Sequence, residues 1–159
     1  MSQPAPQEPD LEALLAQEAE LTFRSFDNDD AWRLGTALVD AARSRGLAVT
    51  VDIVRSGQQL FHAALPGTSA DNDAWVARKA RVVQRYGHSS LYVGELARSR
   101  GTSFEESSRL DPDTYAAHGG SFPVTVDGVG VVGAVTVSGL PQLGDHALVV
   151  DVLRGFPRG

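Results

Sequence analysis

One stretch of this chain decides its fold. Residues 118–123 read His-Gly-Gly-Ser-Phe-Pro, and residues 128–139 read Gly-Val-Gly-Val-Val-Gly-Ala-Val-Thr-Val-Ser-Gly. Asp127-Gly128 between them is a typical turn of a β-hairpin. The spacing therefore predicts two paired strands, 122–126 and 129–137, that are entered and left through glycine turns. The second strand is apolar at nearly every position, so we expect both its faces to be buried, one by helices and the other by more helices or another subunit.

The rest of the chain predicts helices and one further hairpin. Caps and apolar spacing predict five helices, which begin at Asp10, at Asp27 or Asn28, at Asp71 or Asn72, near residue 88 and at Pro141. The other hairpin joins strands 47–54 and 58–65, and the alternating segment 21–26 is typical of a short fifth strand. This order predicts an α+β fold with a central antiparallel sheet of about five strands flanked by helices.

The composition predicts a globular protein. The chain has 159 residues, of which 42% are apolar and 21% are charged, and this length favours one domain. Residues 1–9 contain three prolines and little that can pack, so we expect a disordered lead-in there and a single domain over 10–159. The absence of cysteine excludes disulfides and thiolate metal sites. With neither a membrane-spanning run nor a secretory signal, we expect a cytoplasmic protein without a membrane partner.

Charge is unevenly distributed along the chain. The formal net charge is −6, and residues 1–30 hold eight acidic residues against one arginine. An acidic chain without a strongly basic face is not expected to bind nucleic acid. The exception is one predicted helix, in which no acidic residue interrupts a group of four basic ones, Arg78, Lys79, Arg81 and Arg85.

The turn and the hairpin resemble a known family. A Gly-Gly-x-x-Pro turn spans 119–123 and Gly-Ala-x-x-Val-Ser-Gly spans 133–139, with Asp145 near the start of the last helix. This ordered set is similar to the GlcG/HbpS-like family, in the branch named for a haem-degrading domain. Asn72-Asp73-Ala74-Trp75 and His88-Ser89-Ser90 look similar to the same branch.

The resemblance covers roughly residues 20–155 and carries several expectations. It implies a profilin-like fold, homo-oligomers, and haem or a related tetrapyrrole as the ligand. Some members bind haem or act as redox-linked accessory sensors, whereas others have no settled activity. A haem-degrading activity is implied only by the family label.

His118, Gly119 and Gly120 form the first candidate site. Glycines allow a positive φ and a close approach of the ligand, and they leave N–H groups for an anion. His118 is a candidate ligand of haem iron or a proton shuttle. Phe122 and Pro123 continue the turn and belong to the same candidate pocket. The alternative is a strained turn into a strand, with an exposed histidine.

Ser138, Gly139, Asp145 and His146 form the second candidate site. The Gly139 N–H lies at a strand–helix turn, where such groups bind anions. Asp145 is favoured by the helix dipole or serves as the N-cap, and His146 falls close to the apolar face of the helix. The alternative is a capping aspartate with a packed or interfacial histidine.

Arg78 and Lys79 form the third candidate site. A basic helix face can hold ligand carboxylates, including haem propionates. Its alternatives are a contact with the acidic N-terminal helices or a solvated surface. Two functions therefore stay open: an oligomeric small-ligand-binding protein that binds and even degrades haem, and a non-catalytic assembly or adaptor protein whose turns build subunit interfaces.

Overall fold

The computed structural model describes residues 9–158, so the predicted lead-in 1–9 lies outside the described residues except for its last position. All five predicted helices and both predicted hairpins are present, and residues 101–120, whose sequence is typical of a helical turn and a loop, contain one short helix, α5. The elements are α1 (Leu11–Glu20), α2 (Asn28–Ser44), β1 (Thr50–Arg55), β2 (Gln58–Ala64), α3 (Ala70–Tyr86), α4 (Ser90–Ser99), α5 (Phe104–Ser108), β3 (Ser121–Val126), β4 (Gly130–Ser138) and α6 (Gln142–Gly155).

The sheet has four antiparallel strands in the order β2-β1-β4-β3, so the two hairpins join through β1 and β4. The α+β class is confirmed, and the expected number of strands is corrected from five to four. The segment 21–26 makes a single parallel bridge, Phe23 to Val126, in place of a strand. Its alternation arises because Leu21, Phe23 and Phe26 are buried in the core between the end of α1 and the start of α2.

Capping groups set where the helices begin. In α2 a capping box operates: Asp27 Oδ1 accepts the N–H of Asp30 at 2.9 Å, and Asp30 Oδ2 accepts the N–H of Asp27 at 2.8 Å. Helix α3 begins at Ala70, before the predicted position, because the Asn72 side chain reaches back to accept the N–H of Ser69 at 2.9 Å. Within residues 9–158, no helix has both the length and the apolar character needed to cross a membrane.

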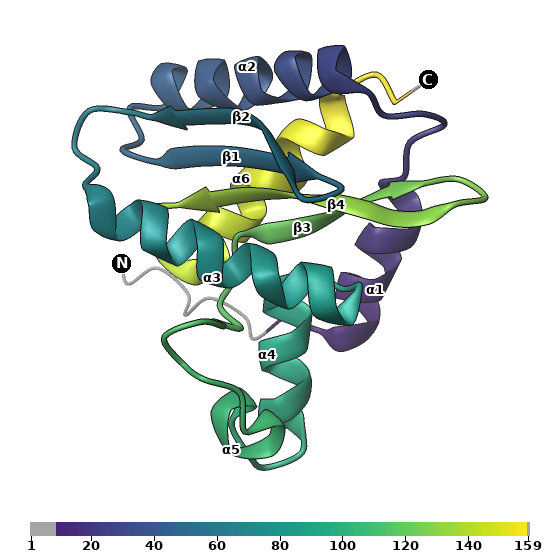
Figure 1. Cartoon of the computed structure of the whole chain (residues 1–159), viewed down its shortest axis with the longest axis vertical. Helices are drawn as coiled ribbons and strands as arrows, with labels where there is room; N and C mark the ends of the chain where they lie inside the picture. The colour runs from purple at the N-terminus through teal and green to yellow at the C-terminus, as the bar shows by residue number, and fades with distance from the viewer. Residues whose placement is uncertain (1–8, 159) are drawn as a thin grey trace, which may run out of the picture.

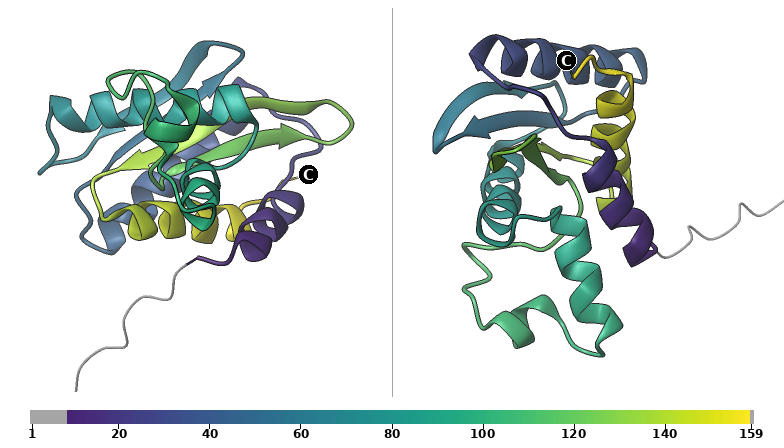
Figure 2. Two further views of the ribbon diagram at one scale, coloured as in Figure 1. Left: turned by 90° about the horizontal axis from the view of Figure 1, so that it is seen from below. Right: turned by 90° about the vertical axis from the view of Figure 1, so that its right-hand side faces the viewer.

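One face of the sheet is packed with apolar side chains, and we call it the apolar face. Successive residues of a strand point to opposite faces, and α2 and α6 cover this one (Figure 1). Its central side chains are buried in the main core and come from three strands: Val51, Ile53, Phe122, Val135 and Val137. Figure 2 (right) shows the sheet lying between α6 on one side and α3 on the other.

The opposite face, which we call the polar face, lies under α3. Ala80 and Val83 of α3 pack there on Ala134 of β4. Most of its other central positions are hydroxyl or carboxyl side chains, and all of these are buried: Thr50, Asp52, Ser121, Thr136 and Ser138. The chain therefore buries a layer of polar groups between a helix and its sheet.

The apolar strand β4 is covered on both faces by helices of its own chain. Residues 133–138 are buried, with α6 on one side and α3 on the other. Of the two arrangements expected for the second face, further helices and not another subunit provide the cover there. Only the hairpin end is open, where Val129 is 73% and Val131 41% exposed.

Candidate functional site

A cavity of about 250 Å³ opens at one end of the polar face, between α3, the end of β4 and the first turn of α6. Five candidate residues from the sequence line it: Lys79, His118, Ser138, Gly139 and Asp145. The other lining residues were not selected from the sequence: Asp71, Asn72, Trp75, Leu140 and Gln142. The structure thus brings the three separate candidate sites together around one cavity.

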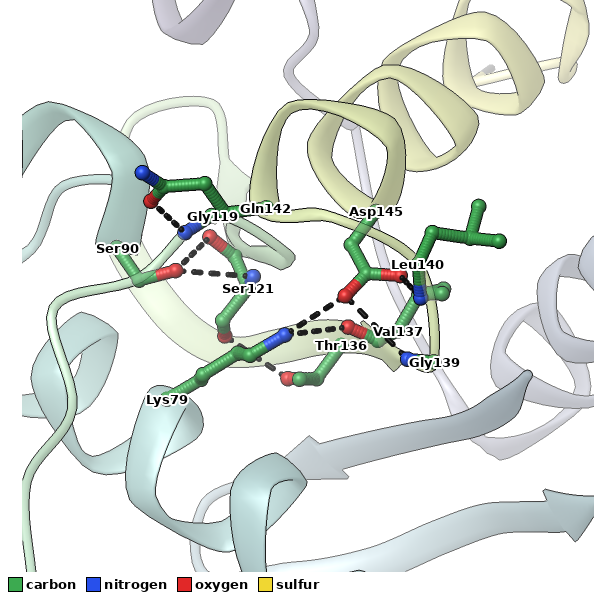
Figure 3. Close-up of polar contacts among 10 residues, drawn as sticks. All are labelled: Lys79, Ser90, Gly119, Ser121, Thr136, Val137, Gly139, Leu140, Gln142 and Asp145. Carbon is green, nitrogen blue, oxygen red and sulfur yellow. Dashed lines mark hydrogen bonds and ion pairs between the residues drawn. The ribbon is translucent and has the colours of Figure 1, made fainter. Parts of the chain in front are cut away.

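An ion pair between Lys79 and Asp145 forms the wall of the cavity. Lys79 Nζ lies 3.0 Å from Asp145 Oδ2 and also donates a hydrogen bond to the carbonyl oxygen of Val137 at 3.1 Å (Figure 3). Lys79 is only 3% and Asp145 1% exposed. A buried pair of this kind is retained only where further hydrogen bonds satisfy both ions, and here β4 supplies one of them.

Asp145 reaches back from the first turn of α6 to the turn that precedes the helix. Its Oδ1 accepts the N–H of Leu140 at 2.9 Å, and its Oδ2 accepts the N–H of Gly139 at 3.4 Å. The start of a helix favours a negative charge. The sequence predicts that the Gly139 N–H serves a ligand anion, but the carboxylate of the chain itself takes that position.

Burial acts on both members of the ion pair. It raises the pKa of Asp145, while Lys79 and the N–H groups of Leu140 and Gly139 oppose the rise. It lowers the pKa of Lys79, and Asp145 opposes that change. The charged form of each residue therefore depends on the other, and losing either would leave an isolated ion in a desolvated place.

The glycine turn allows the backbone to contact this pair. Gly120 has φ +136°, and a Cβ there would lie 2.4 Å from the carbonyl oxygen of Val137 and 2.7 Å from Lys79 Nζ. Only glycine fits such a position without displacing backbone. The N–H of Gly119 donates to Gln142 Oε1 at 3.0 Å, so it is engaged by the chain itself and not held free for an anion.

His118 is exposed at the mouth of the cavity. Its ring meets the indole of Trp75 edge to face, with ring centroids 5.2 Å apart, and Arg78 stacks on that indole at 4.2 Å. Partial desolvation lowers the pKa of His118; Glu105 opposes this, and the positive charges of Lys79, Arg98 and Arg78 add to it. At neutral pH the imidazole is therefore unprotonated, which is the form that ligates metal ions. Neither of its nitrogens is hydrogen-bonded within residues 9–158.

With the site defined, comparison with known proteins identifies the family. A family model described as "Haem degrading protein HbpS-like" matches residues 26–154. The chain belongs to the HbpS-like family. The resemblance carried by segments 119–123 and 133–139 is thereby confirmed.

Relatives of this HbpS-like chain match it over nearly its whole length. A UPF0303 protein of Streptomyces coelicolor is 66% identical over 152 residues, which are 96% of each chain. The crystal structure of the Ybr137w protein matches with a TM-score of 0.86 and 32% identity, over 92% of this chain and 87% of that one. A PduOC:haem complex matches with a TM-score of 0.70 over 85% of this chain and 97% of that one, and at 17% identity it shows a shared fold alone.

Six predicted site residues of the HbpS-like chain are not in the cavity lining, namely Arg78, Gly119, Gly120, Phe122, Pro123 and His146. Phe122 belongs to the core of the apolar face, and Pro123 is buried in β3 opposite Ala134. His146 is buried beside Phe122, and its Nε2 lies 2.7 Å from Oε1 of Gln17 in α1. Burial lowers the pKa of His146 to about 4, so this histidine is a neutral packed residue.

Two arginines of the basic face of α3 contact another part of the same chain. Arg78 Nε donates to the carbonyl oxygen of Pro112 at 3.1 Å, and an Arg81 guanidinium nitrogen donates to that of Thr114 at 3.3 Å. The arginines thus hold the loop that leads to His118, an arrangement that differs from a free ligand-binding face. Lys79 points away from this loop, into the protein.

A second layer of hydrogen bonds fixes the glycine turn. Ser121 Oγ pairs with Thr136 Oγ1 at 2.8 Å, and the Ser121 N–H donates to Ser90 Oγ at 3.0 Å. No signal in the sequence joins Ser90 to Ser121.

The sequence could have indicated Trp75 as a lining residue. It precedes Lys79 by four residues on one helix, so the two side chains share one side of that helix. Across residues 9–158, no group of three histidine, aspartate or glutamate side chains is placed to hold a metal ion.

Proposed function

We propose that this protein binds a small molecule at the cavity between α3 and α6, with haem or a related tetrapyrrole as the ligand and a homo-oligomer as the working form. The observation that carries the proposal is His118. It is an exposed, neutral imidazole beside a flat indole at the mouth of a cavity. An imidazole with both nitrogens unengaged is suited to bind iron.

The size of the cavity limits how a tetrapyrrole fits. Pockets that enclose drug-sized ligands measure roughly 300–1,000 Å³, and this one measures about 250 Å³. A macrocycle is therefore not enclosed, and only an edge or a side arm of it enters. In this arrangement His118 ligates the iron and Trp75 provides a flat contact. Bound haem iron supplies oxygen and electron-transfer chemistry, and the chain supplies the ligand and the binding surface.

The relatives support this choice of ligand. The family description names haem degradation, and a protein of the same fold was solved as a haem complex. The common fold places an equivalent sheet and helices in that protein. Haem is therefore the first ligand to test on this chain.

Haem titration tests the proposal. Purified protein titrated with haem should give a saturable shift of the Soret band at one haem per chain. His118→Ala should abolish the shift, and the control His62→Gln, at an exposed histidine outside the cavity, should leave it unchanged. Weak, unsaturable binding that no histidine variant alters would overturn the proposal.

A non-catalytic assembly or adaptor function is the second candidate. Two exposed apolar side chains favour it, Trp32 at 65% and Val129 at 73% exposure, because such residues at a surface often mark contacts with other proteins. Light scattering after size exclusion should show an oligomer that Val129→Asp or Trp32→Ser dissociates. A monomer at every concentration tested would exclude this function and the oligomeric part of the first.

A further inference from the structure

The hydrogen-bonding groups of the cavity that have no protein partner are mostly donors. We infer that the cavity binds a planar carboxylate group, with Lys79 as its charged donor. The inference rests on the proposed function in one respect, namely that this cavity is the ligand site. It adds the chemical class of the group that enters, which is independent of whether a metal is present.

Lys79 provides the first unused donor. An ammonium group has three N–H donors, and within the described chain two acceptors are in reach, the Val137 carbonyl oxygen and Asp145 Oδ2. One N–H is left, and Lys79 lines the cavity. Asp145 shares its own charge with the N–H groups of Leu140 and Gly139, so Lys79 keeps positive charge to offer a ligand.

Two amide side chains provide further donors. The oxygen of Asn72 accepts the N–H of Ser69 at 2.9 Å, and the oxygen of Gln142 accepts the N–H of Gly119 at 3.0 Å. Of the two polar atoms of a side-chain amide only the oxygen accepts a hydrogen bond, so these contacts determine which way each amide is turned. The NH₂ groups of both residues then have no acceptor within residues 9–158. The indole N–H of Trp75 likewise has no acceptor within residues 9–158.

The acceptors around the cavity are fewer. Asp145 is already engaged by three donors, and the Ser138 hydroxyl can donate as well as accept. Asp71 is the opposing charge, an exposed carboxylate at the start of α3, and the guanidinium of Arg78 lies over the Trp75 ring at 4.2 Å. A ligand rich in acceptors therefore satisfies this lining, and a ligand rich in donors does not.

The shape of the cavity favours a ligand group that is planar and small. Trp75 and His118 place aromatic rings in its lining, which stand edge to face with centroids 5.2 Å apart, and a volume of about 250 Å³ admits a single ring or a short arm. A carboxylate of this kind has two sources, a free aromatic or unsaturated acid and the propionate arm of a tetrapyrrole. The chemistry of recognition is the same for both.

Tryptophan fluorescence gives a direct test with small probes. The chain has two tryptophans, and Trp32 packs on Phe61 outside the cavity, so in Trp32→Phe the signal comes from Trp75 alone. In this background, benzoate should produce a saturable change. Benzamide, the neutral analogue of the same shape, should bind at least tenfold more weakly. Indole emission shifts with the polarity beside the ring, so it reports occupancy of the cavity itself.

Two isosteric variants test the donors without removing structural contacts. Gln142→Glu and Asn72→Asp keep the oxygens that accept from Gly119 and Ser69, and each exchanges an NH₂ donor for a carboxylate oxygen. Each should reduce benzoate affinity at least tenfold. The matched control is Gln84→Glu, which adds the same charge at an exposed position of α3 outside the cavity and should change affinity less than twofold.

Haem and haem dimethyl ester distinguish the source of the carboxylate. A tenfold preference for haem over its ester that Gln142→Glu abolishes assigns the site to a propionate. Benzoate binding without haem binding supports the inference with a free acid and removes the haem proposal. If benzoate binds no better than benzamide and the ester binds as tightly as haem, the inference is wrong. In that case a Soret shift that depends on His118 would still uphold the proposed function.

Discussion

The two faces of the sheet bury their residues by opposite means. The apolar face packs Val51, Val135 and similar side chains against α2 and α6, where burial itself stabilises the fold. The polar face buries Asp52, Thr136 and the ion pair of Lys79 and Asp145, where burial costs free energy unless each group finds a partner. The cavity opens where this second face meets the start of α6. The hydrogen-bonding groups that line the cavity therefore belong to the face on which burial costs free energy.

Breaking the ion pair should have the largest effect on stability. Lys79→Met leaves Asp145 as a buried, uncompensated carboxylate, and such losses cost about 3–5 kcal/mol. Urea unfolding should show a free energy of unfolding lower by about 4 kcal/mol. The double variant Lys79→Met/Asp145→Asn should recover most of it, since asparagine still accepts the N–H of Leu140. A double variant as unstable as the single one would show that the charge is not the cause.

Truncation on the apolar face should come next. Leu148 of α6 is 2% exposed and belongs to the main core under the apolar face, and Leu148→Ala should cost about 3 kcal/mol through lost contacts and a cavity. Urea unfolding measures this loss too. In the ion pair, the loss caused by one substitution can be recovered by substituting the second residue. On the apolar face we expect no such recovery, because a truncated side chain leaves no unpaired charge behind. Recovery of stability by a second truncation nearby would contradict that distinction.

His146 makes the apolar side sensitive to pH. Its pKa is about 4 in the folded protein and about 6.5 in an unfolded chain, so the unfolded state binds more protons between these values. Its contribution to stability is complete above pH 6.5 and is lost as pH falls toward 4. The loss should be about 2 kcal/mol between pH 6.5 and 5. Denaturation midpoints over this range should fall more steeply in the wild type than in His146→Gln.

The smallest effect should come from the hydroxyl pair. Thr136→Val leaves Ser121 Oγ, which lies 2.8 Å from Thr136 Oγ1, without that partner and should cost about 1 kcal/mol. Ser121→Ala/Thr136→Val removes both hydroxyls and should be nearly neutral. Thermal unfolding with the two variants side by side measures the difference. Equal losses in both would mean that the contact itself, and not an unpaired hydroxyl, determines the cost.

Much of the fold could be predicted because its signals are local. Asp127-Gly128 forms the turn between β3 and β4, and Asp27 caps α2, since a turn or a cap involves only a few neighbouring residues. The segment 21–26 was predicted wrongly for the same reason. The alternation of apolar residues in this segment indicates that one side of it is buried. A segment can be buried in this way without pairing with another strand. The sequence left His146 as either a site residue or a packed one, and the structure packs it beside Phe122, because adjacent residues of a helix point in different directions.

The amino-acid sequence by itself determined the helices, the two hairpins, the glycine turn at Gly119-Gly120 and the family. These follow from backbone preferences and the spacing of apolar residues, which act over a few positions. Only the tertiary structure decided that Lys79 meets Asp145, 66 residues away, and that Trp75 faces His118. It also turned the arginines of α3 toward the loop of their own chain. Such contacts depend on which helix covers which face of the sheet, and that choice is made when the whole chain packs.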